Sequence, residues 1–546
     1  MILSRIENRL TKRHDSMKKI LILILFLILG WAGSTWFIGN KTEELLDTYL
    51  KQNQKSYADM GIDAQFKIKD YKKSFLKSTA KTSLSLNTGD PALDNVLKNI
   101  QLNNIITHGP LLLADGTPSF GTVRIHSTLD MDALTPETKD FLTKVFGDKN
   151  PLSSTMTFGL NKTVDYTITI PAIDLSVAAD KSTIKLKNGI HLSGTANKET
   201  LMGTLQGTMG RWDILVDKQK FTTSASTIDI DMQGIVAGQM MGTTKFSLPS
   251  VNAELTSLPQ QVSFAVDMIT NMQKSDDKAI QGDTSFKLTK IKAPVDISEL
   301  HFTGNFKGFQ IKGLEQLADA QQEIQKLQFS TLDDNLSEAE QKALMTKLQG
   351  LPALLTSAVQ NILKKDQTAM TVKLDVSSSQ GKAVLDADTR YIGNGVDINI
   401  EKIATGGLPE VMKILEGKFN FSAPKSMIAT TPAALMMPLL TMNGLILETD
   451  DKYSLSTVFK GDTVTLNNKD MTTDEFMALV GSLKSGGNPS STELDQSQDD
   501  GLPEAIPEAL LKELSKQKIE DLIEQGVPEE VVMQVEAFKA KTNATK

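Results

Sequence analysis

The sequence predicts an α+β protein dominated by β-structure: a single N-terminal transmembrane helix, then large curved antiparallel sheets with interspersed helices. Three observations lead to this fold class. One apolar run lies close to the N-terminus. Most of the following 450 residues place apolar side chains at every second position, which is typical of strands with one buried face. Only short segments between these strands show the spacing of amphipathic helices.

The apolar run extends from Ile20 to Ile38, and its 19 residues would span about 28 Å as a helix. This length is close to the hydrocarbon thickness of a bilayer. The preceding segment 1–19 is rich in Lys and Arg, and the segment after Asn40 is not. By the positive-inside rule, we expect residues 1–19 in the cytoplasm and the bulk of the chain on the opposite side of the membrane.

A cleaved signal peptide is the alternative interpretation of this run. Its charged start and apolar core would suit one. However, no good small-residue cleavage site follows, and Trp36, Phe37 and Ile38 continue the apolar stretch. We therefore expect an uncleaved signal-anchor.

Composition excludes several functional classes. The net charge of −8 argues against a nucleic-acid-binding surface. The chain has no cysteine, so it can form neither a disulfide framework nor a lipoprotein acylation site, and it offers no thiol nucleophile or zinc-thiolate site.

A helix is expected to leave the membrane between Lys41 and Ala58, with Leu45, Leu46, Tyr49 and Leu50 on one face. From about Ile62 onward, a period of two predicts strands. The clearest examples are 66–69, 164–170, 228–232, 370–376 and 396–400.

Turn residues predict how these strands connect. Asn188-Gly189 and Gly393-Asn394-Gly395 separate consecutive strands, as in hairpins. Parallel sheets need long helical crossovers and are buried on both faces, and neither property fits this pattern. We therefore expect antiparallel sheets with one solvated face.

Helices are expected at a few places in this β-rich body. Their expected ranges are 313–327, 337–349 (opened by a Ser337/Glu340 capping box), 352–363 and 408–416. The uncharged stretch from Ser426 to Leu447 could be mistaken for a second membrane span. Its two prolines, and the acidic residues that follow it, indicate buried or groove-lining helical turns instead.

The composition changes after Leu483. Residues 483–506 are rich in Ser, Gly and acidic residues, which predicts a flexible linker. Residues 507–546 follow as a C-terminal helical tail, divided at Gly526-Val527-Pro528. Two short helices bury little surface alone, so the tail is expected to pack on the main domain or on a partner.

Several short motifs occur in an order that resembles the YdgA/YihF family of bacterial inner-membrane-anchored proteins of unknown function. The membrane segment 27–39 is followed by Tyr71, Phe75 and Ser78 of a Y-x-x-x-F-x-x-S segment, with Ser74 where a glycine is usual. A His108-Gly109-Pro110 motif, a junction at 306–314 and a closing hairpin at 444–469 come next. The resemblance covers residues 20–475 and implies that 39–482 form a YdgA-like β-rich domain in the periplasm of a Gram-negative bacterium. It assigns no role to the motif residues.

No pattern indicates catalysis. The sequence lacks a P-loop, a G-x-S-x-G elbow, an H-E-x-x-H motif and a dinucleotide fingerprint, and it predicts no cofactor and no metal site. An S-x-x-K match at Ser78 and Lys81 falls in a predicted strand, where positions i and i+3 point to opposite faces. His108 is the histidine of most interest, because it ends a strand at a rigid corner where its ring could bond a backbone carbonyl.

Three functional hypotheses follow. The first and preferred one is a non-enzymatic envelope protein, anchored in the inner membrane through residues 20–38, that binds a lipid, a peptide or another envelope component. The second is a periplasmic hydrolase with dispersed catalytic residues, in which His108 would meet a nucleophile. The third is a scaffold or adaptor that docks a partner through the C-terminal helices.

Overall fold

The structure is a computed structural model. It describes residues 31–484, except for 33, 53, 56–62, 88–99, 115–116, 178–181, 201, 257–260, 293–295, 331–337 and 394–407, and beyond these it describes Val535 and Lys539. The predicted basic segment, most of the run Ile20–Ile38, the strand 396–400, and nearly all of the linker and of the tail lie outside the described residues. Residues 483 and 484, which were predicted to begin the linker, are instead the end of a helix. None of the helices that are described is long and apolar enough to cross a membrane.

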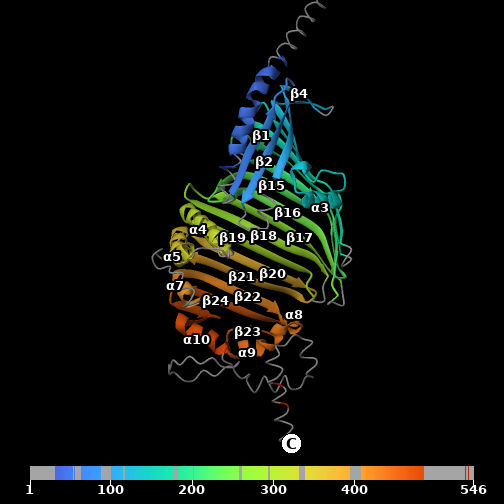
Figure 1. Cartoon of the computed structure of the whole chain (residues 1–546). Helices are drawn as coiled ribbons and strands as arrows, with labels where there is room; N and C mark the ends of the chain where they lie inside the picture. Colours follow the sequence, from blue (N-terminus) through green and yellow to red (C-terminus); the bar gives the residue numbers. More distant parts are fainter. Residues whose placement is uncertain are drawn as a thin grey trace, which may run out of the picture. The chain divides into compact units, whose positions relative to one another are not determined.

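The chain divides into two compact units. Unit 1 comprises residues 1–296 and 305–363, and unit 2 comprises residues 297–304 and 364–546. Both are built mainly of antiparallel strands, which confirms the prediction of a β-dominated antiparallel fold (Figure 1).

Unit 1 contains a large antiparallel sheet in which most strands pair with their neighbours in the chain. Its first strands pair in the order β1–β2–β3–β6–β7–β8. The strand bounds to this point are β1 Asp63–Lys72, β2 Lys77–Asn87, β3 Ile100–His108, β6 Val123–Leu129, β7 Ser153–Phe158 and β8 Thr163–Ile170. A separate short hairpin, β4 (Leu111–Ala114) with β5 (Thr117–Phe120), is inserted between β3 and β6.

The sheet continues through ten further strands, several of which lie end to end along a shared neighbour. These are β9 Ile173–Val177, β10 Ser182–Leu186, β11 Ile190–Asn197, β12 Gly203–Met209, β13 Trp212–Val216, β14 Gln219–Thr223, β15 Ser226–Val236, β16 Gln239–Glu254, β17 Val262–Lys274 and β18 Ala279–Lys292. β11 pairs with β8 and β12, whereas β10 pairs with β9 and β13. β19 (Glu299–Gln310) follows; its residues 299–304 belong to unit 2 and the rest to unit 1.

This pairing corrects the prediction of a hairpin at Asn188-Gly189. β10 and β11 do not pair with each other; they follow one another along β13 and β12, which are themselves consecutive and separated by two residues. Asn188 and Gly189 therefore form a bulge within one long strand, with φ of 65° and 64°. Glycine is required at 189 because a Cβ there would lie 2.1 Å from the Ile170 carbonyl oxygen.

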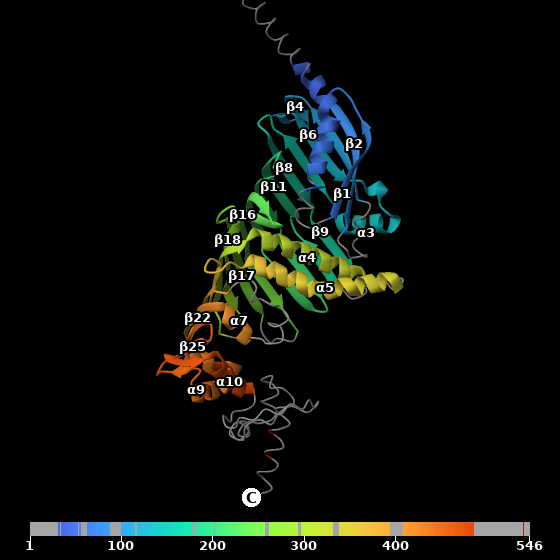
Figure 2. The ribbon, with the colours of Figure 1, turned by 90° about the vertical axis from the view of Figure 1, so that its left-hand side faces the viewer.

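The N-terminal helix, described at residues 31–32, 34–52 and 54–55, packs on the first strands of unit 1 (Figures 1 and 2). Leu46 lies in a buried cluster with Ala80, Ile106, Val123 and Ile125. Leu50 packs against this cluster, and the Tyr49 ring meets Phe158 edge-on at 5.2 Å. Leu45, which was predicted to share this face, is instead 47% exposed.

Three further helices belong to unit 1. They are α3 (Pro136–Phe146), α4 (Ile311–Ser330) and α5 (Glu338–Ile362), and α4 and α5 pack against each other (Figure 2). The prediction of separate helices at 337–349 and 352–363 was wrong, because α5 runs through Pro352. The junction at 306–314 does lead from β19 directly into α4.

Unit 2 is a smaller antiparallel sheet that carries helices. Its strands pair in the order β20–β21–β22–β24–β25–β26, and β23 pairs with the start of β24. The bounds are β20 Ala369–Ser378, β21 Gly381–Tyr391, β22 Leu415–Pro424, β23 Leu447–Glu448, β24 Lys452–Lys460, β25 Thr463–Leu466 and β26 Lys469–Thr472. The helices are α7 Leu408–Ile414, α8 Lys425–Ala429, α9 Met437–Met442 and α10 Thr473–Lys484.

Two local signals set the end of unit 2. Asn467 and Asn468, with φ of 49° and 67°, make the two-residue turn between β25 and β26. Thr472 and Glu475 form a reciprocal capping box at the start of α10: the Thr472 N–H donates to the Glu475 carboxylate (2.7 Å), and the Glu475 N–H donates to the Thr472 hydroxyl (3.2 Å). These contacts hold the first turn of α10 beside the edge of the sheet.

Candidate functional site

An apolar pocket of about 540 Å³ lies in unit 2. The inward-facing positions of three adjacent strands form its floor, and α7, α9, α10 and the turn after α9 form its walls. The side chains that line it include Ala387, Thr389, Val411, Met412, Leu415, Phe419, Leu440, Leu445, Ile446, Leu455, Thr457, Phe459, Phe476 and Val480. The volume lies within the range of small-molecule sites, about 300–1,000 Å³.

The alternation of the strands explains why this floor is apolar. Leu455, Thr457 and Phe459 occupy alternate positions of β24 and share the pocket face. Lys418 borders the pocket, but it pairs in register with Asp388 and Val458, on the opposite face of the sheet. Its ammonium group lies 3.9 Å from the Asp388 carboxylate. The pocket therefore presents no charged side chain from its floor.

The stretch 426–447, which was expected to form groove-lining turns, folds as α8, a 3₁₀ turn at Pro432–Leu435, and α9. Leu440, Leu445 and Ile446 from this stretch line the pocket. Asn467 fixes the turn after α9, since its side-chain amide donates to the carbonyl oxygens of Gly444 (3.0 Å) and Leu445 (3.1 Å).

The sequence motif residues gather in unit 1, where the N-terminal helix meets the end of β3. The His108 ring is fully buried, and its two nitrogens contact hydroxyl groups from different elements. Nε2 lies 2.7 Å from the Ser78 Oγ on β2, and Nδ1 lies 3.1 Å from the Thr42 Oγ1 on the N-terminal helix. The ring therefore joins the helix to the sheet, with hydroxyl partners instead of the backbone carbonyl that the sequence indicated.

The direction of these hydrogen bonds follows from the donors available. The Thr42 hydroxyl donates its only proton to the Ile38 carbonyl at 2.8 Å, so it can only accept from the ring. Nδ1 therefore carries a proton, and in the neutral ring Nε2 accepts from the Ser78 hydroxyl. Burial lowers the pKa of His108, and the positive charge of Lys73 lowers it further, so the neutral ring is the favoured form.

Tyr71 completes this cluster from β1. Burial raises the pKa of its phenol; the nearby Ser78 hydroxyl opposes that rise, and the carboxylate of Glu43 adds to it. Gly109, with φ of 119°, turns the chain directly beneath the helix, where a Cβ would lie 2.6 Å from the Thr35 Oγ1. Pro110 follows at the corner, and its carbonyl oxygen accepts from the Gly121 N–H at 3.2 Å. Phe75 is instead exposed at the edge of this region.

The Ser78–His108 contact has the chemistry of a nucleophile and its general base. In this structure the pair is covered, because Ser78 and His108 are each only 1% exposed. The group behind Nδ1 is a threonine hydroxyl and not the carboxylate that would stabilise an imidazolium. The arrangement is suited to fastening the helix to the sheet.

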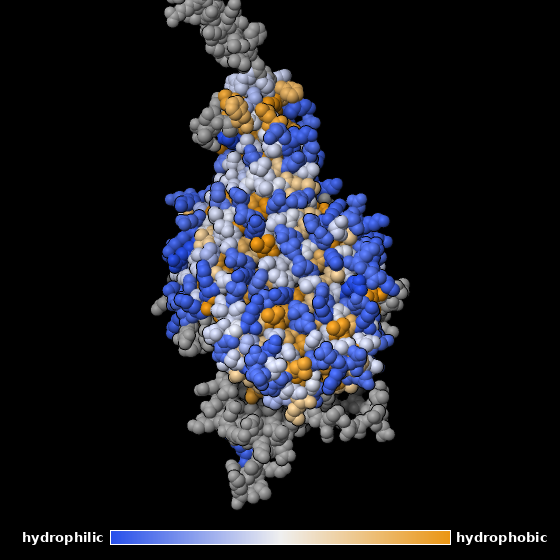
Figure 3. Space-filling model, turned by 180° about the vertical axis from the view of Figure 1, so that it is seen from behind, coloured by the Kyte–Doolittle hydropathy of each residue, from blue (hydrophilic) through white to orange (hydrophobic). Residues whose placement is uncertain are grey.

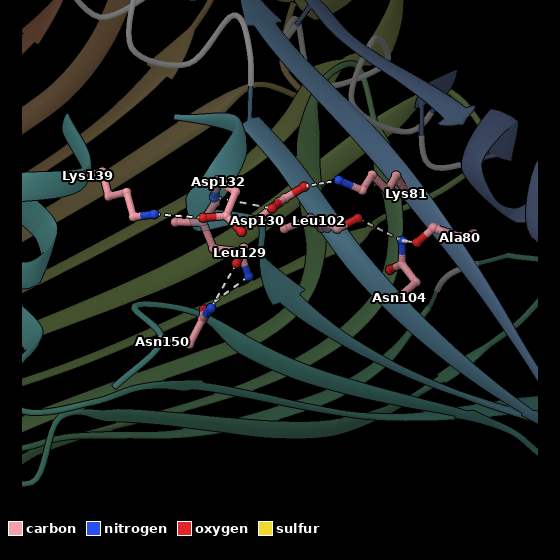
Figure 4. A network of polar contacts seen from close by, with 9 residues as sticks. All are labelled: Ala80, Lys81, Leu102, Asn104, Leu129, Asp130, Asp132, Lys139 and Asn150. Carbon is pink, nitrogen blue, oxygen red and sulfur yellow. Dashed lines mark hydrogen bonds and ion pairs between the residues drawn. The ribbon is translucent and has the colours of Figure 1, made fainter. Parts of the chain in front are cut away.

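A second polar network lies further along the same strands and includes Asp130, which follows the end of β6 (Figure 4). The Lys81 ammonium contacts the buried Asp130 carboxylate at 2.6 Å, and the hydrogen bond from Lys81 is the main cause that lowers the pKa of Asp130. Asn104 is buried on β3 and donates to the Ala80 carbonyl at 3.1 Å. Ser78 is buried whereas Lys81 reaches solvent, as predicted for the S-x-x-K match on a strand.

Thr42 was not identified from the sequence, although a signal for it exists. Thr35, Gly39, Thr42 and Leu46 follow the spacing of one helical face, and all four are buried against the sheet. The small side chains on this face indicate a close helix–sheet contact. Among the residues that the structure describes, no group of three or more His, Cys, Asp or Glu side chains could hold a metal ion.

Comparison with known proteins gives one family. The model of a family described as "Bacterial protein of unknown function (DUF945)" matches residues 17–474. Neither the curated proteins nor the solved structures contain a match to the chain.

Proposed function

The chain belongs to the bacterial family DUF945, and on that premise we propose that it is an inner-membrane-anchored envelope protein that binds the acyl chain of a lipid in the pocket of unit 2. The apolar run Ile20–Ile38 and the basic residues before it support the anchoring and the periplasmic location of the remaining chain. The observation that carries the ligand class is the pocket itself, with its volume of about 540 Å³ and its apolar lining.

The lining favours an acyl chain over a peptide. A peptide would bring backbone N–H and C=O groups into a site where, among the described side chains that face it, the hydrogen-bonding groups are the hydroxyls of Thr389 and Thr457; Lys418 borders it from the opposite face of the sheet. Each buried group left unpaired would cost about 1–3 kcal/mol. An acyl chain has no such groups, and each methylene that it buries contributes about 0.8 kcal/mol.

The experiment uses two variants of the same kind. Val480→Trp places an indole in the pocket from α10, whereas Val458→Trp places one on β24 at a position that is 48% exposed on the opposite face. The full-length chain is extracted in detergent, and its bound lipid is measured by native mass spectrometry and by lipid extraction.

We expect about one lipid per wild-type chain, the same in Val458→Trp, and an at least tenfold lower occupancy in Val480→Trp. Equal occupancy in all three proteins would show that the lipid binds elsewhere. A wild-type protein without stoichiometric lipid would refute the proposal.

One specific observation favours the hydrolase alternative, namely the 2.7 Å contact between His108 and Ser78. A fluorophosphonate probe tests it, because such probes label activated serines. Since Ser78 is buried, we expect no labelling of the peptide that contains it. Labelling of Ser78 that disappears in His108→Ala would support the hydrolase hypothesis and contradict a purely structural role for the Ser78–His108 contact.

A further inference from the structure

Large apolar side chains are exposed at the end of unit 1 where the N-terminal helix enters. Trp36 and Phe37 are 60% and 61% exposed, and Phe120 is 79% exposed. Phe75 and Leu76, in the turn between β1 and β2, are exposed as well. We refer to these five residues as the apolar rim. Figure 3 shows hydrophobic side chains gathered at this end of the unit, whereas most of the visible face is hydrophilic.

Contacts within unit 1 bring the members of the apolar rim together around the His108 corner. Trp36 and Phe75 line one small pocket of about 310 Å³. The Leu76 carbonyl accepts from the His108 N–H at 3.0 Å. Phe120 pairs in register with Leu111, just beyond this corner. The rim therefore surrounds one corner, although its members come from three separate segments of the chain; Phe37 is included as the exposed neighbour of Trp36 on the helix.

The residues of the N-terminal helix that each part of the apolar rim contacts show how far along the helix axis that part lies. The Trp31 Nε1 lies 3.5 Å from the Leu111 carbonyl oxygen, so the β4–β5 hairpin lies beside Trp31. The turn 73–75 lies instead beside Trp36 and Gly39. Five residues separate Trp31 from Trp36, which corresponds to about 7 Å along the helix axis. The hairpin therefore lies beside an earlier part of the helix, closer to its N-terminal end, than the turn does.

Positive charge borders the rim on the side of the turn. Lys72, Lys73 and Lys77 are all exposed, and within the described part of the chain none of them forms an ion pair. Exposed aromatic side chains beside lysines match the interfacial layer of a bilayer, where aromatic rings and basic groups meet lipid headgroups. The apolar run Ile20–Ile38 continues into the same helix.

We propose that the apolar rim is seated in the interfacial layer of a phospholipid bilayer, with Lys72, Lys73 and Lys77 on anionic headgroups and the β4–β5 hairpin deeper than the turn 73–76. This inference rests on the proposed membrane anchoring. It adds a second membrane contact besides the transmembrane helix. This contact would fix the orientation of unit 1 relative to the membrane surface.

The absence of cysteine makes the test direct, because one introduced cysteine carries one label. An environment-sensitive fluorophore is attached to the full chain at Phe75→Cys, at Phe120→Cys, or at the control Phe141→Cys. Phe141 is similarly exposed (52%, against 46% for Phe75) but lies on α3, which follows the opposite end of β6. Proteoliposomes contain either zwitterionic lipid alone or added anionic phospholipid, with quenchers placed at shallow or deep acyl positions.

We expect quenching at positions 75 and 120, deeper at 120, and none at 141. Anionic lipid should increase the quenching at 75 at least twofold, and the triple variant Lys72→Gln/Lys73→Gln/Lys77→Gln should abolish that increase. A matched triple variant, Lys245→Gln/Lys274→Gln/Lys290→Gln, changes exposed lysines on β16–β18 and should retain it.

Extraction at alkaline pH separates the two ways in which the account can fail. If the protein stays in the membrane but positions 75 and 120 are no more quenched than 141, the rim does not contact lipid and the inference is wrong. If the protein is released from the membrane, the proposed anchoring itself is wrong.

Discussion

Replacing His108 by alanine tests the contact between the N-terminal helix and the sheet. The imidazole accepts from Ser78 and donates to Thr42, at 2.7 and 3.1 Å, and the ring is 1% exposed. His108→Ala removes both hydrogen bonds and leaves a cavity between the helix and β2. Thr42 keeps its bond to the Ile38 carbonyl, whereas Ser78 loses its acceptor.

The expected loss of stability follows from these contacts. Two hydrogen bonds contribute a net of about 0.5–1.5 kcal/mol each, and the unsatisfied Ser78 hydroxyl costs about 1–3 kcal/mol. The cavity adds to this loss. The hydrogen-bond and hydroxyl contributions sum to about 2–6 kcal/mol, and 3 kcal/mol corresponds to a factor of about 150 in an equilibrium constant.

Amide hydrogen exchange measured by mass spectrometry reports this local opening. We expect peptides that cover residues 38–50 to exchange at least 100-fold faster in His108→Ala than in the wild type. His126→Ala is the control, since His126 is only partly buried on β6 and its Nδ1 lies 3.2 Å from the Thr155 Oγ1, away from the N-terminal helix. It should change the same peptides less than fivefold. Exchange in His108→Ala within threefold of the wild type would refute the fastening role.

Three further predictions concern the same region. Because the pKa of His108 is lowered in the folded state, the unfolded state binds a proton at a higher pH than the folded state does. The free energy of unfolding, measured with urea, should therefore fall as the pH decreases below the ordinary histidine pKa of about 6.5. His108→Gln should lack this part of the pH dependence. Gly109→Ala should destabilise unit 1 by more than 1 kcal/mol in the same assay, because φ is 119° and the new Cβ meets the Thr35 hydroxyl, whereas Gly147→Ala, with open space around it, should be milder. Asp130→Asn should lower the free energy of unfolding by about 1–3 kcal/mol at pH 7, because it breaks the contact with Lys81. Since the pKa of Asp130 is lowered in the folded state, the difference in this free energy between variant and wild type should shrink as the pH falls below about 4. A difference that does not change with pH would contradict this assignment.

The sequence was informative where local periodicity decides the structure. The alternation in 164–170 and 228–232 predicted β8 and β15, because one face of each strand is buried more than the other. The junction at 306–314 and the end of a strand at His108 were also apparent from local pattern. The bulge at Asn188-Gly189 was not, because the same dipeptide serves a hairpin or a bulge according to which strands lie alongside.

The candidate sites depend on long-range packing, which periodicity does not encode. Ser78 meets His108 across 30 residues because β2 and β3 pair with Ser78 opposite Ile106. Thr42 reaches the same ring across 66 residues because its helix packs on those strands. The residues that line the pocket of unit 2 lie between positions 387 and 480. In the sequence, each of these segments has the pattern of an ordinary buried strand or helix, and the pocket becomes apparent only from how the helices pack on the sheet.

Photocrosslinking in intact bacterial membranes tests lipid binding in unit 2 most directly. A phospholipid with a diazirine near the end of its acyl chain is incorporated, the full-length protein is irradiated, and the labelled peptides are mapped. The account predicts crosslinks at the pocket segments 411–419, 440–446, 455–459 and 476–480, in addition to any in the apolar run, and their loss in Val480→Trp but not in Val458→Trp. Crosslinks confined to residues 20–38, with none in the pocket segments, would contradict it.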